Sequence, residues 1–299
     1  MILIVGSSGH LGRATALRLL AQGKPVRLMS RNPATLNDLE KRGAEVVRGD
    51  LRDLPSLKDA CRGVDQVVAA AHALNGKGDN NPHTVDDLGN RRLIDAAKDA
   101  GVKQFVFISI QNVAPDSFLE FFRIKYAIEE YLRASGLGYT ILRPMAFMDL
   151  WGEMIGQPII EKGKATTFGS GNNPINFVAV EDLARLIEAV LEDERTLNQS
   201  YDVCGPENLT MNQVTGIFQG LAGRPAQIQH VPLPMLRVLS VVMPPFNPMM
   251  GRLIRNSVYV DTAKLTCEGS GIPQGLPAPK TRFEDWARSF SAPAARVLA

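Results

Sequence analysis

Short apolar runs alternate with longer amphipathic segments through the first half of the chain. The apolar runs predict strands at residues 2–5, 26–30, 45–48, 66–71, 104–110 and 139–142, and helical periodicity lies between them at 11–21, 33–41, 57–61, 85–100 and 118–134. Several of the strands are apolar on both faces, as expected when helices cover both sides of a parallel sheet. The alternation predicts an α/β fold with a doubly wound, Rossmann-type parallel sheet.

Glycine and proline mark the ends of these predicted helices. Gly23, Gly43, Gly101 and Gly136 each follow a helical segment, where a left-handed residue commonly ends a helix. Asn32-Pro33 has the pattern of an N-cap followed by proline at the first helical position.

The pattern changes after Pro144, where elements become short and irregular. Strands are predicted at 176–180 and 200–203, and helices at 182–193 and 210–221, with Thr210 and Asp182 as helix caps. We expect residues 1–150 to form a dinucleotide-binding core. Residues 151–299 are expected to form a small C-terminal α/β lobe for substrate or partner, interleaved with the core in one compact unit.

One segment of that second part, residues 231–256, is apolar and rich in methionine and proline. Two interpretations remain open for it: a wall of a substrate pocket, or a contact with a partner or a membrane surface. No run of about 18 apolar residues occurs in the chain, so no membrane-spanning helix is expected.

The charge and cysteine content exclude some classes of function. The chain has 33 Lys and Arg against 31 Asp and Glu, which offers no basic excess for nucleic acid. Cys61, Cys204 and Cys267 lie far apart and show no metal-ligand spacing. We therefore expect reduced cysteines, no metal, a cytoplasmic location and no nucleic-acid partner.

The first strand is followed at once by the glycine-rich segment GSSGHLG, which opens a helix. A helix N-terminus presents unpaired N–H groups and partial positive charge, and glycine lets a pyrophosphate approach the backbone. This context predicts a dinucleotide site rather than an ordinary turn. The residues expected to contact the cofactor here are Gly6, Ser8, Gly9, His10, Leu11 and Gly12.

The end of the second strand indicates which dinucleotide is bound. An NAD site usually has an acid there for the ribose 2′-hydroxyl, but this chain has Arg31, whose guanidinium suits a 2′-phosphate. The cofactor is therefore predicted to be NADP(H). Asp50 is expected either to reach the adenine or to serve as a turn acid, and Leu51 and Ala70 are further expected cofactor contacts.

Together, the motifs GSSGHLG, MSRNP, GDLRD, LIDAAKDAGVKQFVFISI, RIKYAIEEYLRASGLGYTILRPMAFM and FVAVEDLAR resemble those of atypical short-chain dehydrogenases/reductases. The similarity is greatest to the NmrA-like and isoflavone-reductase-like branch, and it covers roughly residues 1–205. It implies a Rossmann fold and an NAD(P) cofactor, while the last third of the chain matches in outline only.

The resemblance also implies candidate catalytic residues. Typical carbonyl-reducing members have a serine and a Tyr-x-x-x-Lys pair; here Ser109 and Lys125 are present, but Phe121 stands where the tyrosine would be. Isoflavone-reductase-like proteins likewise keep the lysine without the tyrosine. Lys125 would contact the nicotinamide ribose and assist proton transfer, and Ser109 would face the substrate. The structural alternatives are a surface ion pair between Lys125 and Glu129, and a strand-end role for Ser109.

In that family the turn after the sixth strand lines the nicotinamide, which implies cofactor contacts for Pro144 and Phe147, although Phe147 would equally suit the core. Gln111, Phe121 and Met145 are expected to face the substrate; for Gln111 the alternative is that it only turns the loop.

Two functions are compatible with these features. The first is an NADP(H)-dependent reductase of a small, fairly apolar carbonyl or conjugated compound. The second is a non-catalytic NADP(H)-sensing regulatory or assembly protein, which the missing tyrosine would suit.

Overall fold

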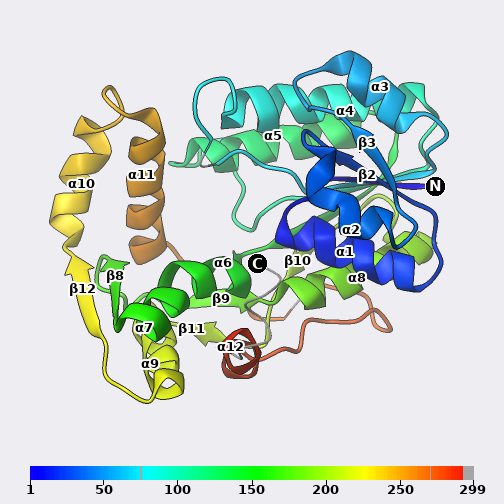
Figure 1. The fold of residues 1–299 in the computed structure, drawn as a ribbon. Coiled ribbons are helices and arrows are strands. Elements are labelled where there is room, and N and C mark those ends of the chain that lie inside the picture. The colour runs from blue at the N-terminus through cyan, green and yellow to red at the C-terminus, as the bar shows by residue number, and fades with distance from the viewer. Residues whose placement is uncertain (75, 270, 292–299) are drawn as a thin grey trace. The chain divides into compact units, whose positions relative to one another are not determined.

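Figure 1 shows the fold in a computed structural model that describes residues 1–74, 76–269 and 271–291. The chain divides into two units. Unit 1 comprises Met1–Pro144, Leu183–Asp202 and Gly271–Pro277. Unit 2 comprises Met145–Asp182 and Val203–Ser270, followed by the chain from Ala278 onward.

Unit 1 is built on a seven-stranded sheet with the order β10-β6-β5-β4-β1-β2-β3. The strands are β1 (Ile2–Val5), β2 (Val26–Ser30), β3 (Glu45–Arg48), β4 (Gln66–Ala69), β5 (Gln104–Ile108), β6 (Gly138–Pro144) and β10 (Gln199–Val203). The six strands from β3 to β6 pair in parallel, with Ile4 opposite both Leu28 and Val68. This is the strand order of a Rossmann fold, which confirms the predicted fold class.

Helices connect these strands. They are α1 (His10–Ala21), α2 (Asn37–Glu40), α3 (Leu54–Cys61), α4 (Leu88–Asp99), α5 (Glu120–Ala134) and α8 (Val180–Glu192). A 3₁₀ turn, Pro33–Leu36, precedes α2, and a π-helical turn, Pro82–Asp87, precedes α4. The helices predicted at 33–41 and 85–100 are thus each divided into two geometries that hydrophobic periodicity does not distinguish.

The core of unit 1 lies against the sheet. Leu3, Val67, Phe105 and Phe107 are fully buried, as are residues of α4 and α5 that pack in the same cluster. The four glycines predicted to end helices have positive φ angles, between +69° at Gly23 and +99° at Gly43. That conformation is easy for glycine and costly for residues with a Cβ.

Unit 2 contains two small sheets. One has the order β11-β9-β7, with β7 (Ala146–Phe147), β9 (Ile175–Val178) and β11 (Asn208–Leu209); the other pairs β8 (Lys164–Phe168) with β12 (Gln227–Val231). Its helices are α6 (Met148–Trp151), α7 (Gln157–Lys162), α9 (Met211–Ala222), α10 (Leu233–Val242), α11 (Pro248–Thr262) and α12 (Phe283–Ser291).

An aromatic cluster forms the centre of unit 2. Phe177, Phe218 and Phe283 are fully buried and meet edge to face, and Trp286 packs beside Phe283. The predicted cap at Thr210 is present, since its side chain accepts a hydrogen bond from Gln213 N and Gln213 returns one. Local sequence therefore sets the start of α9, while long-range packing sets the core.

The predicted cap at Asp182 is wrong. Helix α8 begins at Val180, so Asp182 lies within its first turn. Its Oδ2 atom accepts hydrogen bonds from Lys280 N and Thr281 N, at 2.9 and 2.7 Å. Asp182 is buried, and its carboxylate binds the backbone of a segment about a hundred residues further along the chain. A contact over that sequence distance is not visible in a local pattern.

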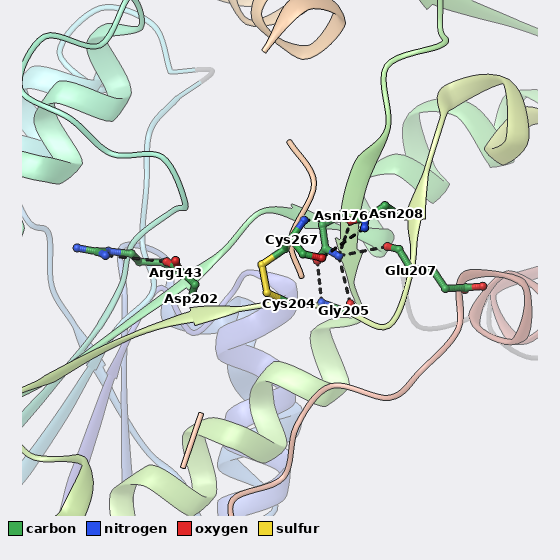
Figure 2. The surroundings of a disulfide bond; sticks show 8 residues. All are labelled: Arg143, Asn176, Asp202, Cys204, Gly205, Glu207, Asn208 and Cys267. Carbon is green, nitrogen blue, oxygen red and sulfur yellow. Dashed lines mark hydrogen bonds and ion pairs between the residues drawn. A yellow bond between two sulfur atoms is a disulfide. The ribbon is translucent and has the colours of Figure 1, made fainter. Parts of the chain in front are cut away.

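The expectation of fully reduced cysteines is also wrong, because Cys204 and Cys267 form a disulfide (Figure 2). Their Cα atoms lie 5.5 Å apart although 63 positions separate them in sequence. Asn176 and Asn208 hold the flanking backbone: Asn176 Oδ1 accepts from Gly205 N, and Asn208 Oδ1 accepts from Cys267 N. Burial raises the pKa of the remaining thiol, Cys61, to about 11.

Candidate cofactor and catalytic site

The loop from β1 into α1 is shaped by its glycines. Gly6 has a φ of +92°, and a Cβ there would lie 2.7 Å from Ala71 N. A Cβ on Gly12 would lie 2.3 Å from the Gly6 carbonyl oxygen. Both positions therefore require glycine for packing, apart from any ligand.

Gly9 differs from the other two, because a Cβ there would meet nothing closer than 3.4 Å. It is the N-cap residue of α1, where no side chain caps the helix and no acid lies in the first turn. Ser8, Gly9 and His10 are exposed at this end, whereas Leu11 is buried. Such a helix N-terminus fits a phosphate group, which its N–H groups and dipole would stabilise.

Arg31 follows β2 and is exposed. Its Nη1 atom donates a hydrogen bond to Asn80 Oδ1 at 2.9 Å, so a residue of the loop after β4 orients the guanidinium. An exposed, oriented arginine after the second strand fits a 2′-phosphate.

Asp50 has the contacts of a turn-forming acid. It accepts a bond from Arg52 N at 2.9 Å, and Arg52 Nη2 lies 2.6 Å from its other oxygen. Arg52, with a smaller contribution from Arg31, holds the pKa of Asp50 below its usual value. The other expected contacts near it are placed by the sheet: Leu51 is buried, and Ala70 N donates to Val5 O at 2.9 Å.

Lys125 on α5 is buried, with only 4% of its surface exposed. Its Nζ atom donates to Ile108 O at 3.0 Å, at the carboxyl end of β5. The ammonium group lies 4.6 Å from the ring centroid of Phe107 and 5.5 Å from that of Phe121. Burial lowers the pKa of Lys125, and the charges of Asp86 and Glu129 oppose that shift without cancelling it. The alternative of a surface ion pair is therefore wrong.

Asp86, at the end of the π-helical turn before α4, faces this lysine. It is fully buried; its Oδ2 atom accepts a bond from Ala73 N at 2.8 Å, and its Oδ1 atom lies 3.9 Å from Lys125 Nζ. That Oδ1 atom makes no hydrogen bond with any residue the structure describes. Burial raises the pKa of Asp86 to about 6, against the opposing effects of Lys125 and the Ala73 N–H group. A buried acid and a buried base are thus adjacent.

The hydroxyl group of Ser109 donates a hydrogen bond to Glu129. Its Oγ atom lies 2.6 Å from Glu129 Oε1, and both side chains are buried. Glu129 also accepts hydrogen bonds from Arg143 Nε at 2.9 Å and Arg133 Nη2 at 3.0 Å. Burial by itself would raise the pKa of Glu129, but these hydrogen bonds and charges hold it below its usual value. Ser109 therefore has the contacts of a structural strand-end residue.

Phe121 occupies the position of the missing tyrosine and is buried. The His72 ring meets it edge to face, with centroids 6.2 Å apart. His72 as a whole residue is exposed, yet desolvation by surrounding protein and the Lys125 charge both lower its pKa. The lysine, the aromatic edge and the histidine thus form one group at the carboxyl ends of β4 and β5.

The remaining predicted residues fall in both units. Gln111 N donates to Pro144 O at 3.2 Å, which joins the ends of β5 and β6 in unit 1. Met145 packs against the core of unit 2, and Phe147 pairs with Val178 between β7 and β9.

Sequence reasoning missed Asp86 and the structural role of Glu129. A signal existed in each case, because both acids lie on the apolar face of a helical pattern. Asp86 precedes the buried Leu93 by seven positions, and Glu129 precedes the buried Leu132 by three. An acid at such spacing is buried only with a partner, which makes it worth testing as a site residue.

Comparisons with known proteins agree with this architecture. The model of the NmrA-like family matches residues 1–267. An NAD(P)H azoreductase of Xenophilus azovorans is 32% identical over 235 residues, covering 78% of each chain. Photosystem II assembly factor Ycf39 of Trieres chinensis is 29% identical over 241 residues, covering 81% of this chain and 75% of its own length.

Among solved structures, the NADPH-dependent quinone oxidoreductase QOR2 of Escherichia coli, complexed with NADPH, superimposes with a TM-score of 0.75. The two sequences are 22% identical, and the superposition covers 98% of this chain and 100% of the other. At that identity the likeness concerns the fold. The family match covers residues 1–267 and so extends over both units, which shows that this chain belongs to the NmrA-like family.

Proposed function

We propose that this protein is an NADP(H)-dependent reductase of small, fairly apolar carbonyl or conjugated compounds. The observation that carries the proposal is the buried Lys125, held beside Asp86 with a lowered pKa at the carboxyl end of the central sheet. Perturbed ionisable groups at such a position are typical of catalytic sites. The azoreductase relative supports nicotinamide-dependent reduction within the family.

The glycine loop and Arg31 would hold the cofactor. The N-terminus of α1 at Gly9 would bind the pyrophosphate, and Arg31, oriented by Asn80, would bind the 2′-phosphate. Lys125, Ala70, Pro144 and Phe147 are further proposed contacts. When bound, reduced NADP(H) supplies the hydride.

Lys125 would supply the proton. Reduction of a carbonyl adds a hydride to carbon and a proton to oxygen, and Phe121 has no proton to give. A lysine with a lowered pKa can exchange protons nearer neutrality than an exposed one. Phe121, together with Gln111 and Met145, would contact an apolar substrate. Ser109 is hydrogen-bonded to Glu129 and would instead help to position the end of β5.

The second candidate is a non-catalytic NADP(H)-responsive assembly or regulatory protein. Two observations favour it: the relatives include a photosystem II assembly factor, and a phenylalanine replaces the tyrosine of typical reductases. In that case Lys125 would bind cofactor only.

A direct assay separates the two candidates. NADPH oxidation is followed with the purified protein and a panel containing a benzoquinone, an azo dye, an enone and an aldehyde. We expect turnover with at least one member, and loss of that turnover in Lys125→Met. If no member is reduced while NADPH binds, the reductase proposal is wrong and the second candidate stands.

A further inference from the structure

Helices α10 and α11 of unit 2 form an antiparallel hairpin, which lies at the left of Figure 1. The hairpin is held along its inner side, where Leu236 and Ile254 are buried. Arg255 Nε donates to Ser240 O at 3.2 Å, and Gly251 lets the turn approach α11, since a Cβ there would lie 2.8 Å from Pro244 Cα. The hairpin is therefore an ordered element with a defined tip.

Its outer side is apolar and exposed. Val238 and Val242, one turn apart on α10, are 63% and 52% exposed; Val241 is 72% exposed, and Phe246 at the tip is 82% exposed. Met235 continues the same surface. These five residues, called the apolar ridge below, place large side chains in water where a helix normally presents polar ones.

The sequence that contains the hairpin carries few negative charges. Between Glu207 and Asp261 the sequence contains no acidic residue, although the chain as a whole has 31. Within the hairpin, Arg237 on α10 is exposed next to Val238, and Arg252 and Arg255 on α11 are half-buried. An apolar ridge that carries an exposed arginine and no acid on its own helix complements a surface that is apolar beneath and negatively charged on top.

We propose that the apolar ridge docks on the surface of a bilayer that contains anionic lipids, with Phe246 inserted among the acyl chains and the exposed Arg237 at the headgroups. A second copy of the chain suits the ridge less well, because a two-fold contact through α10 would bring together two helices that each carry Arg237 and no acid. Docking would be interfacial, since no helix among the described residues is long and apolar enough to cross a membrane. The inference does not depend on reductase activity.

The test measures binding of the purified protein to vesicles. Vesicles of phosphatidylglycerol mixed with phosphatidylcholine are compared with vesicles of phosphatidylcholine alone, by co-sedimentation at low and high salt. We expect binding to the anionic vesicles that weakens with salt. Phe246→Ser should weaken it about tenfold or more, which corresponds to ~1.4 kcal/mol. Arg237→Glu should weaken binding at low salt and make it less dependent on salt, because it removes a cation from the contact.

Phe118→Ser is the matched control, because Phe118 is also exposed, at 57%, but lies in unit 1. It should leave vesicle binding unchanged, and the melting temperature of each variant is checked to exclude unfolding. Three results would overturn the inference: no binding to anionic vesicles by the wild type, equal loss in Phe118→Ser, or a dimer that Phe246→Ser dissociates in the absence of lipid.

Discussion

The Nζ atom of Lys125 lies 3.9 Å from Oδ1 of Asp86, and both side chains are buried in unit 1. The separation is that of an ion pair without a direct hydrogen bond, because Lys125 donates to Ile108 O and Asp86 accepts from Ala73 N. Each side chain is thus anchored to the end of a different strand connection. The pair couples the protonation of Lys125 to that of Asp86.

This pair makes stability depend on pH. Since burial raises the pKa of Asp86 to about 6 from 3.8, the folded protein binds more protons than the unfolded chain between those values. Asp86 therefore lowers the free energy of unfolding as pH rises through that window, by roughly 2–3 kcal/mol. Asp86→Asn should lack this fall. Urea unfolding of both proteins across the window measures it, and parallel pH profiles would contradict the assignment.

Removing the buried amine tests the proposed proton donor. Lys125→Met should lower turnover by about 10²–10⁴-fold, the range for general acid–base groups, while the exposed Lys98→Met serves as control. Because proton donation needs the charged form, wild-type turnover should fall with rising pH at a pH below 10.5. Phe121→Tyr should leave turnover similar or raise it, since the added hydroxyl restores a donor. Steady-state rates and NADPH affinity are measured separately for each variant.

Cofactor choice depends on Arg31. We expect NADPH to bind at least about tenfold tighter than NADH, and Arg31→Ala to remove that preference while NADH affinity stays the same. Arg42→Ala, at another exposed arginine of unit 1, should change neither. Calorimetric titration with both dinucleotides checks this; equal wild-type affinities would exclude a role for Arg31 with the 2′-phosphate.

Two glycines of the same loop should respond differently. A side chain at Gly9 meets no protein atom closer than 3.4 Å, so Gly9→Val should fold yet lose dinucleotide binding by blocking the helix N-terminus. At Gly12 a Cβ would lie 2.3 Å from the Gly6 carbonyl, so Gly12→Val should lower the melting temperature itself. A folded Gly9→Val variant with normal NADPH affinity would place the pyrophosphate elsewhere.

The Cys204–Cys267 disulfide closes a long loop that carries α9, β12, α10 and α11. Chain-entropy estimates for a loop of this length give about 4 kcal/mol of stability. A reductant should lower the melting temperature of the wild type, and Cys204→Ser/Cys267→Ser should melt at the lower temperature with or without it. An unchanged wild-type melt under reducing conditions would mean that the disulfide does not form in solution.

The sequence by itself determined the parallel sheet, the glycine loop and the helix C-termini that glycines mark. These depend on local chemistry: β-branched apolar runs favour strands, and glycine alone adopts positive φ cheaply. Thr210 was likewise a correct cap, because its partner Gln213 lies within one turn. The lysine of the candidate site was found through a family motif, since its spacing from Glu129 would equally suit a surface pair.

Only the tertiary structure decided the environment of that lysine. Asp86 lies thirty-nine positions before it in the sequence and meets it because the segment after β4 and helix α5 converge at the carboxyl ends of β4 and β5. Asp182 and Cys204 were misassigned for the same reason, as their partners lie far along the chain. Burial and charge are sums over neighbours in space, and a linear pattern reports only neighbours along the backbone.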